Sequence, residues 1–119
     1  MLDDDRTLID QVLDAARLGG LAEPADICDY AVDALDAELL LPRVPKPMSR
    51  GERQICGVLL ALAAPFDTLI VVDPTAGLDM RRREAVRDLL LDCAQLTPTT
   101  RVICATDDPA LIDPQGQVP

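Results

Sequence analysis

Residues 68–79 read Thr-Leu-Ile-Val-Val-Asp-Pro-Thr-Ala-Gly-Leu-Asp. The first five form a continuous β-branched and aliphatic run of strand length, a pattern typical of a strand buried on both faces. The next seven predict a turn, and a helix follows from about Met80 to Leu96, where Thr97-Pro98 ends it. Residues 101–105 form a second run of strand length. This order predicts a βαβ unit with parallel strands and a right-handed crossover.

An apolar helix is expected directly before this unit. Ser49 and Glu52 have the Ser-x-x-Glu spacing of a capping box, which satisfies free amide donors at a helix start. Residues 43–50 contain two prolines at alternate positions and cannot be helical. We therefore divide the chain into a helical subdomain, residues 1–47, and a second part, residues 48–119, that holds this helix and the βαβ unit.

The helical subdomain is predicted to contain two helices. Apolar residues recur at helical spacing from Leu8 to Ala16 until Gly19-Gly20 ends the pattern, and Thr7 and Asp10 have the spacing of a capping box. The second helix is expected to begin near a proline and to bury one apolar side; these residues are Pro24 and then Ile27, Ala31, Ala34, Leu35 and Leu39. Its acidic side is most simply a solvated face, with a cation site as the alternative.

The composition excludes several classes of function. The 119 residues carry a net charge of -10, no histidine and one lysine. Without histidine there is no Ser-His or Cys-His catalytic pair, and an acidic chain is a poor ligand for a phosphate backbone, so nucleic acid is not expected as a partner. No signal peptide or bilayer-length apolar run is evident, which favours a cytoplasmic protein. The cysteines lack metal-site spacing and are expected to be reduced core residues: Cys28, Cys56, Cys93 and Cys104.

Two carboxylates follow the predicted strands. Asp73 comes directly after the first strand, and Asp107 comes two residues after the second. Ligands of such folds bind beyond the carboxyl ends of parallel strands, which makes both residues functional candidates. Roles in a turn or at a helix N-cap are the structural alternative, and Asp107-Asp108-Pro109 resembles the cap and first turn of a further short helix.

Two motifs carry a family resemblance. Residues 48–54, Met-Ser-Arg-Gly-Glu-Arg-Gln, resemble the signature motif of ATP-binding cassette (ABC) ATPases, and residues 73–79 resemble their Walker B/D-loop. The resemblance covers about residues 7–113 in the family's order. It implies a partial P-loop NTPase-like α/β fold that corresponds to the C-terminal half of a cassette, with ATP as the nucleotide.

The resemblance implies site residues and also departures from the family. Asp73 stands at the position of the catalytic glutamate, and Val72 stands where the Walker B aspartate helps to hold Mg²⁺, so a role for Mg²⁺ is doubtful and no metal ligand is assigned. Shifting the alignment by one residue would make Asp73 the metal ligand and delete the base. The implied nucleotide-binding residues are Ser49, Arg50, Gly51, Glu52, Asp79 and Asp107.

Two of these residues change the chemistry of the nucleotide site. Asp107 replaces the family's switch histidine and puts negative charge near the γ-phosphate. Arg50 replaces a glycine, and its side chain either obstructs a phosphate or supplies a cation to it. A Walker A motif is absent, because the single lysine, Lys46, lies between two prolines and outside any glycine-rich turn.

Three functions are compatible with this pattern. The first is a degenerate ABC transporter segment that contributes a signature face to ATP-linked transport or its regulation and does not hydrolyse ATP alone. The second is an ATPase half-site that is active only with a Walker A-bearing cassette half or subunit, and the third is a nucleotide-independent interaction module. A transporter membrane subunit is a further expected partner, which would hold the chain at the inner face of the membrane. A two-stranded sheet would also expose its edges and favour homo-oligomers.

Overall fold

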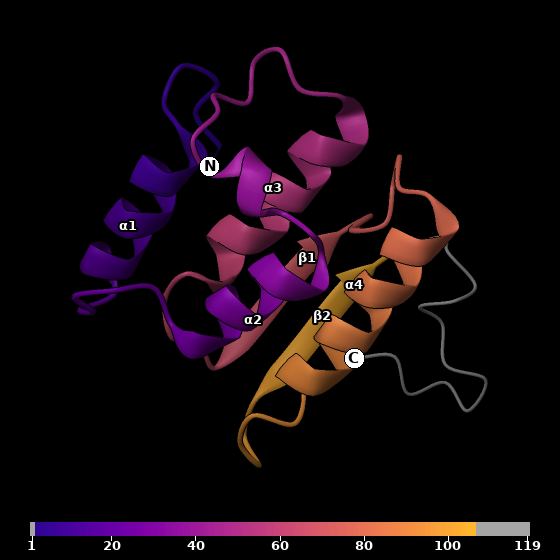
Figure 1. Ribbon diagram of the computed structural model, residues 1–119. Helices are drawn as coiled ribbons and strands as arrows, with labels where there is room; N and C mark the ends of the chain where they lie inside the picture. The colour runs from indigo at the N-terminus through magenta and orange to yellow at the C-terminus, as the bar shows by residue number, and fades with distance from the viewer. Residues whose placement is uncertain (1, 107–119) are drawn as a thin grey trace.

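Four α-helices and a parallel two-stranded sheet form the part of the chain that the structure describes, residues 2–106 of a computed structural model (Figure 1). The elements in order are α1 (Leu8–Leu18), α2 (Asp26–Ala34), the 3₁₀ helix η1 (Glu38–Leu40), α3 (Arg50–Leu62), β1 (Thr68–Val72), α4 (Met80–Cys93) and β2 (Arg101–Ala105). β1 pairs with β2 in parallel, with Thr68 beside Arg101 and Val72 beside Ala105. The predicted α/β class and βαβ unit are confirmed, and the proposed short helix at residues 107–109 lies outside the described residues.

The helices cover one face of the sheet. Leu69, Val71 and Val102 are buried in the same apolar cluster as α3 and α4 side chains such as Leu59 and Leu89. Three side chains on the opposite face are exposed: Ile70 at 67%, Val72 at 66% and Ile103 at 50%. The prediction that the first strand is buried on both faces is therefore wrong, because no described element covers this second face.

Two helix starts agree with the capping-box spacings in the sequence. The Thr7 hydroxyl accepts a hydrogen bond from the Asp10 N–H at 3.3 Å and begins α1. At α3 the box is reciprocal: the Glu52 N–H donates to Ser49 Oγ at 3.1 Å, and the Ser49 N–H donates to Glu52 Oε1 at 3.0 Å. The α3 start is thus fixed by short-range bonds, as the sequence predicted.

The second helix differs from its prediction. α2 begins at Asp26 and ends at Ala34, and Asp36 then adopts a left-handed conformation with φ of 52°. The chain turns there, and the Ala37 N–H donates to the Val32 carbonyl at 2.9 Å. Leu39 consequently lies in η1 with 83% of its surface exposed, so its expected place on the buried side of a longer helix is wrong.

Contacts between side chains join α2 to α4. The Tyr30 hydroxyl donates to Asp92 Oδ2 at 3.3 Å, and the nearby Asp92 carboxylate raises the pKa of Tyr30. Asp36 also forms an exposed ion pair with Arg81 at the start of α4. The acidic helical part of the chain is thereby linked to the βαβ unit by polar contacts as well as by the shared apolar core.

None of the four cysteines forms a disulfide, and three of them are core residues. Burial raises the pKa of the Cys28, Cys56 and Cys93 thiols to about 11, whereas Cys104 is half-buried. Among residues 2–106, no helix has the length and apolar character needed to cross a bilayer.

Candidate functional site

The start of α3 lies directly against the loop at residues 73–79. A Cβ atom placed on Gly51 would stand 2.6 Å from the Gly77 carbonyl oxygen, so the two backbones approach too closely for a side chain at Gly51. Gly77 has φ of 78°, and a Cβ placed there would stand 3.2 Å from Arg50 Cγ. The structure thus brings together the 48–54 and 73–79 motifs through two glycines that are 26 positions apart in the chain.

Hydrogen bonds to the backbone of its first residue, Asp73, hold the 73–79 loop in place. Asp73 has φ of 44°, in the left-handed region that few non-glycine residues adopt. Its N–H continues the sheet ladder to the Ala105 carbonyl at 2.7 Å, and its carbonyl accepts from the Ala76 N–H at 3.0 Å. The Gln54 side chain donates to the same carbonyl at 2.9 Å. Gln54 was not predicted as a site residue, although it closes the 48–54 motif.

Ser49 and Asp79 are both helix N-caps. Asp79 Oδ1 accepts from the Arg82 N–H at 2.9 Å and begins α4, as Ser49 begins α3. Helix capping therefore explains the hydrogen bond that each of the two side chains accepts. The Ser49 hydroxyl can still donate, and the amides of a helix N-terminus favour an anion.

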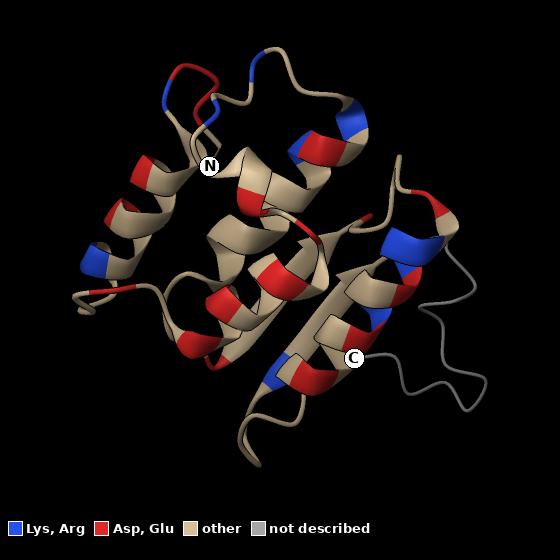
Figure 2. Cartoon of the chain, viewed as in Figure 1, with Lys and Arg blue, Asp and Glu red and all other residues tan. Residues whose placement is uncertain are grey.

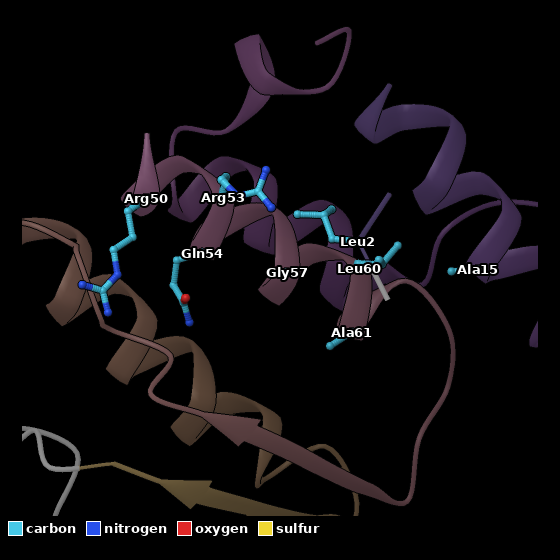
Figure 3. A pocket seen from close by; sticks show the side chains of 8 residues that line it. All are labelled: Leu2, Ala15, Arg50, Arg53, Gln54, Gly57, Leu60 and Ala61. Atoms are coloured by element: carbon cyan, nitrogen blue, oxygen red, sulfur yellow. The ribbon is translucent and has the colours of Figure 1, made fainter. Parts of the chain in front are cut away.

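The charge around this contact is mixed, with arginines at both helix starts (Figure 2). The pKa of Glu52 is lowered chiefly by the hydrogen bond from the Ser49 N–H, with smaller contributions from nearby Arg43 and Arg82. Arg43 also forms an ion pair with Glu52 at 3.4 Å. Arg50 and Gln54 point to the same side of α3, toward the 73–79 loop, whereas Arg53 turns away and pairs with Asp4 (Figure 3).

At the two positions where the family has carboxylates, this chain has only one, at Asp73. Asp73 is exposed at the end of β1, and Val72 projects a hydrocarbon side chain from the open face of the sheet. Within the described residues no group of three or more His, Cys, Asp or Glu side chains could hold a metal ion. Asp107 lies outside the described residues.

No protein-family model matches the chain, but individual proteins do. The osmoprotectant import ATP-binding protein OsmV of Salmonella typhimurium is 36% identical over 74 residues, which are 62% of this chain and 19% of OsmV. The lipoprotein-releasing system ATP-binding protein LolD of Shewanella sp. is 34% identical over 105 residues, which cover 79% of this chain and 45% of LolD. The chain thus spans less than half the length of these two relatives.

Solved structures show the same fold. A dimeric bacterial ABC transporter cassette matches 92% of this chain and 50% of its own, with a TM-score of 0.72 and 18% identity. A protein described as a metal-chelate type ABC transporter, in an inward-facing conformation, matches 94% of this chain and 48% of its own, with a TM-score of 0.64 and 24% identity. By sequence and fold together, the chain is a relative of the ABC ATP-binding proteins and corresponds to a part of their length.

Proposed function

We propose that this chain contributes a signature and D-loop face to a composite nucleotide site in ATP-linked transport or its regulation, and does not hydrolyse ATP alone. The observation that carries this proposal is the backbone contact between Gly51 and Gly77. It places the N-cap Ser49, the start of α3 and the 73–79 loop on one surface. The relatives OsmV and LolD, both named ATP-binding proteins of transport systems, support ATP as the nucleotide.

The residues on this surface suit contact with a phosphate from across an interface. The Ser49 hydroxyl and the free amides of the first turn of α3 are donors, and the helix dipole favours negative charge there. The Arg50 side chain lies over Gly77 and supplies a cation close to these donors. ATP held by a Walker A-bearing partner would supply the phosphates and the cleavable phosphoanhydride bond.

The non-catalytic part of the proposal rests on what is lacking near Asp73. Val72 offers no oxygen ligand at the position where the family has its Walker B aspartate. Aspartate is also one methylene shorter than the family's glutamate, and an error of about 1 Å in positioning can cost ~100-fold in rate. We expect no ATP hydrolysis and very weak ATP binding by the isolated chain. Titration calorimetry that gave micromolar affinity for ATP would contradict this expectation.

The test of the signature face is a substitution at Ser49. Ser49→Arg is expected to abolish nucleotide-dependent association with a Walker A-bearing cassette subunit, measured by sedimentation with and without ATP. Ser49→Thr keeps a hydroxyl and an N-cap and is the matched control. Association that persists in a folded Ser49→Arg variant would favour a nucleotide-independent interaction module instead.

A second candidate is an ATPase half-site that works only in such a complex. The exposed carboxylate of Asp73 at the end of β1 favours it. Asp73→Asn retains a side chain that tolerates the left-handed conformation, and only this candidate predicts that it lowers the ATPase rate of the assembled complex.

The partners and location follow from the same proposal. We place the chain on the cytoplasmic side of the membrane, with a Walker A-bearing cassette half and a transporter membrane subunit as partners. Residues 1–47 would act as the helical subdomain and residues 48–119 as the nucleotide-facing part. Self-association through an open sheet edge is the form that the interaction module would take.

A further inference from the structure

Asp73 adopts a backbone conformation that its own sequence disfavours. Its φ of 44° lies in the left-handed region, where a side chain crowds the backbone. The residue before a proline also favours an extended backbone, and Pro74 follows Asp73. A residue in so unfavourable a conformation persists where surrounding contacts hold it there, and such residues are concentrated at functional sites.

Contacts on both sides of Asp73 hold this conformation. The Asp73 N–H donates to the Ala105 carbonyl at 2.7 Å, which fixes the residue to the end of the sheet. The next side chain, Pro74, is fully buried, so the chain beyond Asp73 is anchored as well. Between these anchors the Asp73 carbonyl accepts hydrogen bonds from the Ala76 N–H at 3.0 Å and from Gln54 Nε2 at 2.9 Å. The bond from Gln54 comes from a different element, α3.

The start of α3 meets the 73–79 loop at both ends of the loop. Gly51 lies against Gly77, and Gln54 binds Asp73. Residues three apart share one face of an α-helix, so both contacts come from the same face of α3. One contact would allow the loop to rotate against the helix, whereas contacts at opposite ends fix its orientation. The Gln54 contact is the one that can be removed without disturbing packed backbone atoms.

We propose that Gln54 is a positioning residue for the nucleotide face. Its amide holds Asp73 in the left-handed conformation and thereby sets the orientation of the 73–79 loop against the start of α3. Gln54 acts through the Asp73 carbonyl and not by touching the nucleotide. This role rests on the proposed function, because the shape of the loop matters to a partner only if this surface faces the nucleotide that the partner holds.

A general stabilising contact is the alternative role for Gln54. Its side chain is half-buried and borders two hollows beside α3, so its packing contributes to stability in either case. The two roles differ in their effect on Asp73. If Gln54 positions the loop, loss of its amide lets Asp73 relax toward the extended backbone favoured before a proline. Loss of packing alone leaves φ at Asp73 unchanged.

The test replaces the Gln54 amide in the ¹⁵N-labelled full chain. Gln54→Met keeps an unbranched side chain of similar length without a donor, and Gln54→Lys keeps a donor. The measured quantity is the nuclear Overhauser effect between the N–H and the Hα of Asp73, which is strong at positive φ because these two protons are then close together. Gln54→Met is expected to weaken this effect, and Gln54→Lys is expected to keep it. An unchanged effect in Gln54→Met would overturn the inference.

The second measurement is ATP-dependent association with a Walker A-bearing cassette subunit, by sedimentation as for Ser49→Arg. Gln54→Met is expected to weaken this association about tenfold, whereas Gln54→Lys keeps it within a few fold. Arg53→Met is the matched control on the side of α3 that pairs with Asp4, and it is expected to change neither measurement. Association of Gln54→Met as tight as that of the parent, despite a weakened Asp73 signal, would also overturn the inference.

The two measurements separate this inference from the proposed function. If the parent chain showed no ATP-dependent association, the proposed function would fail, and the role of Gln54 in it would fail too. An unchanged Asp73 signal in Gln54→Met, with ATP-dependent association of the parent intact, would overturn the role of Gln54 alone.

Discussion

Adding one methyl group at Gly51 should weaken the fold at the point where the two motifs meet. In Gly51→Ala the new Cβ would stand 2.6 Å from the Gly77 carbonyl oxygen. A carbon and a carbonyl oxygen in contact settle at about 3.3 Å, so the backbones must separate by roughly 0.7 Å. The opposing atom is backbone and cannot rotate away, unlike the end of a flexible side chain. Forcing a group into a packed site of this kind costs about 1–3 kcal/mol.

The same helix provides a matched control. A Cβ on Gly57 would meet nothing within 4 Å, and this residue is exposed. Gly57→Ala should therefore gain about 1 kcal/mol from the higher helix propensity of alanine. The two variants add the same atoms to the same helix, so their free energies of unfolding should differ by about 2–4 kcal/mol.

Urea unfolding followed by circular dichroism measures this difference. With a slope of about 1–3 kcal/mol per molar urea, Gly51→Ala should unfold near 1 M lower than the parent chain, and Gly57→Ala should unfold at a higher concentration than the parent. If Gly51→Ala were as stable as Gly57→Ala, the start of α3 would not contact the 73–79 loop closely. The geometry that underlies the proposed nucleotide face would then be incorrect.

Three further predictions concern single side chains. Ser49→Ala removes the N-cap of α3 and should lower the free energy of unfolding by about 1 kcal/mol, while Ser49→Asp should nearly restore it; a neutral Ser49→Ala would contradict the capping role. The lowered pKa of Glu52 means that its ionised form stabilises the fold above the ordinary glutamate pKa, and that this stability is lost as the pH falls through the folded value. The stability difference between the parent and Glu52→Gln should therefore be constant near neutral pH and shrink below about pH 4, and a difference that grows on acidification would refute the sign. Iodoacetamide at pH 8 should label Cys104 first in the native chain, as read by mass spectrometry, because burial raises the pKa of the other three thiols to about 11; equal labelling of all four would argue against their burial.

The elements that the sequence predicted are those set by neighbouring residues. The capping box at Ser49 and Glu52, the strand at residues 68–72 and the helix that begins at Met80 depend on spacing and side-chain type within a few positions. The end of α2 could not be predicted in this way. Asp36 adopts a left-handed turn without a glycine to mark it, and this turn moves Leu39 into solvent.

The site shows the same division between local and long-range information. Family resemblance indicated the motif residues Ser49 and Asp79, and the capping role of Ser49 was also predicted from its spacing to Glu52, whereas the capping bond of Asp79 was not predicted. The bond from Gln54 to the Asp73 carbonyl joins residues 19 positions apart and appears only when α3 is packed against the end of β1. The prediction that the strand at residues 68–72 is buried on both faces was wrong for a related reason: the apolar composition of a strand does not show which elements cover each of its faces.

The contact between Tyr30 and Asp92 gives this chain a built-in optical reporter. Tyr30 is the single tyrosine and there is no tryptophan, so ultraviolet emission comes almost entirely from one ring. A carboxylate that accepts a hydrogen bond from the phenol quenches tyrosine emission. Here the carboxylate belongs to α4, whereas the ring belongs to α2. Emission should brighten whenever α2 moves away from α4. Comparing its urea midpoint with that of circular dichroism would show, without any label, whether the acidic helices detach before the rest of the molecule unfolds.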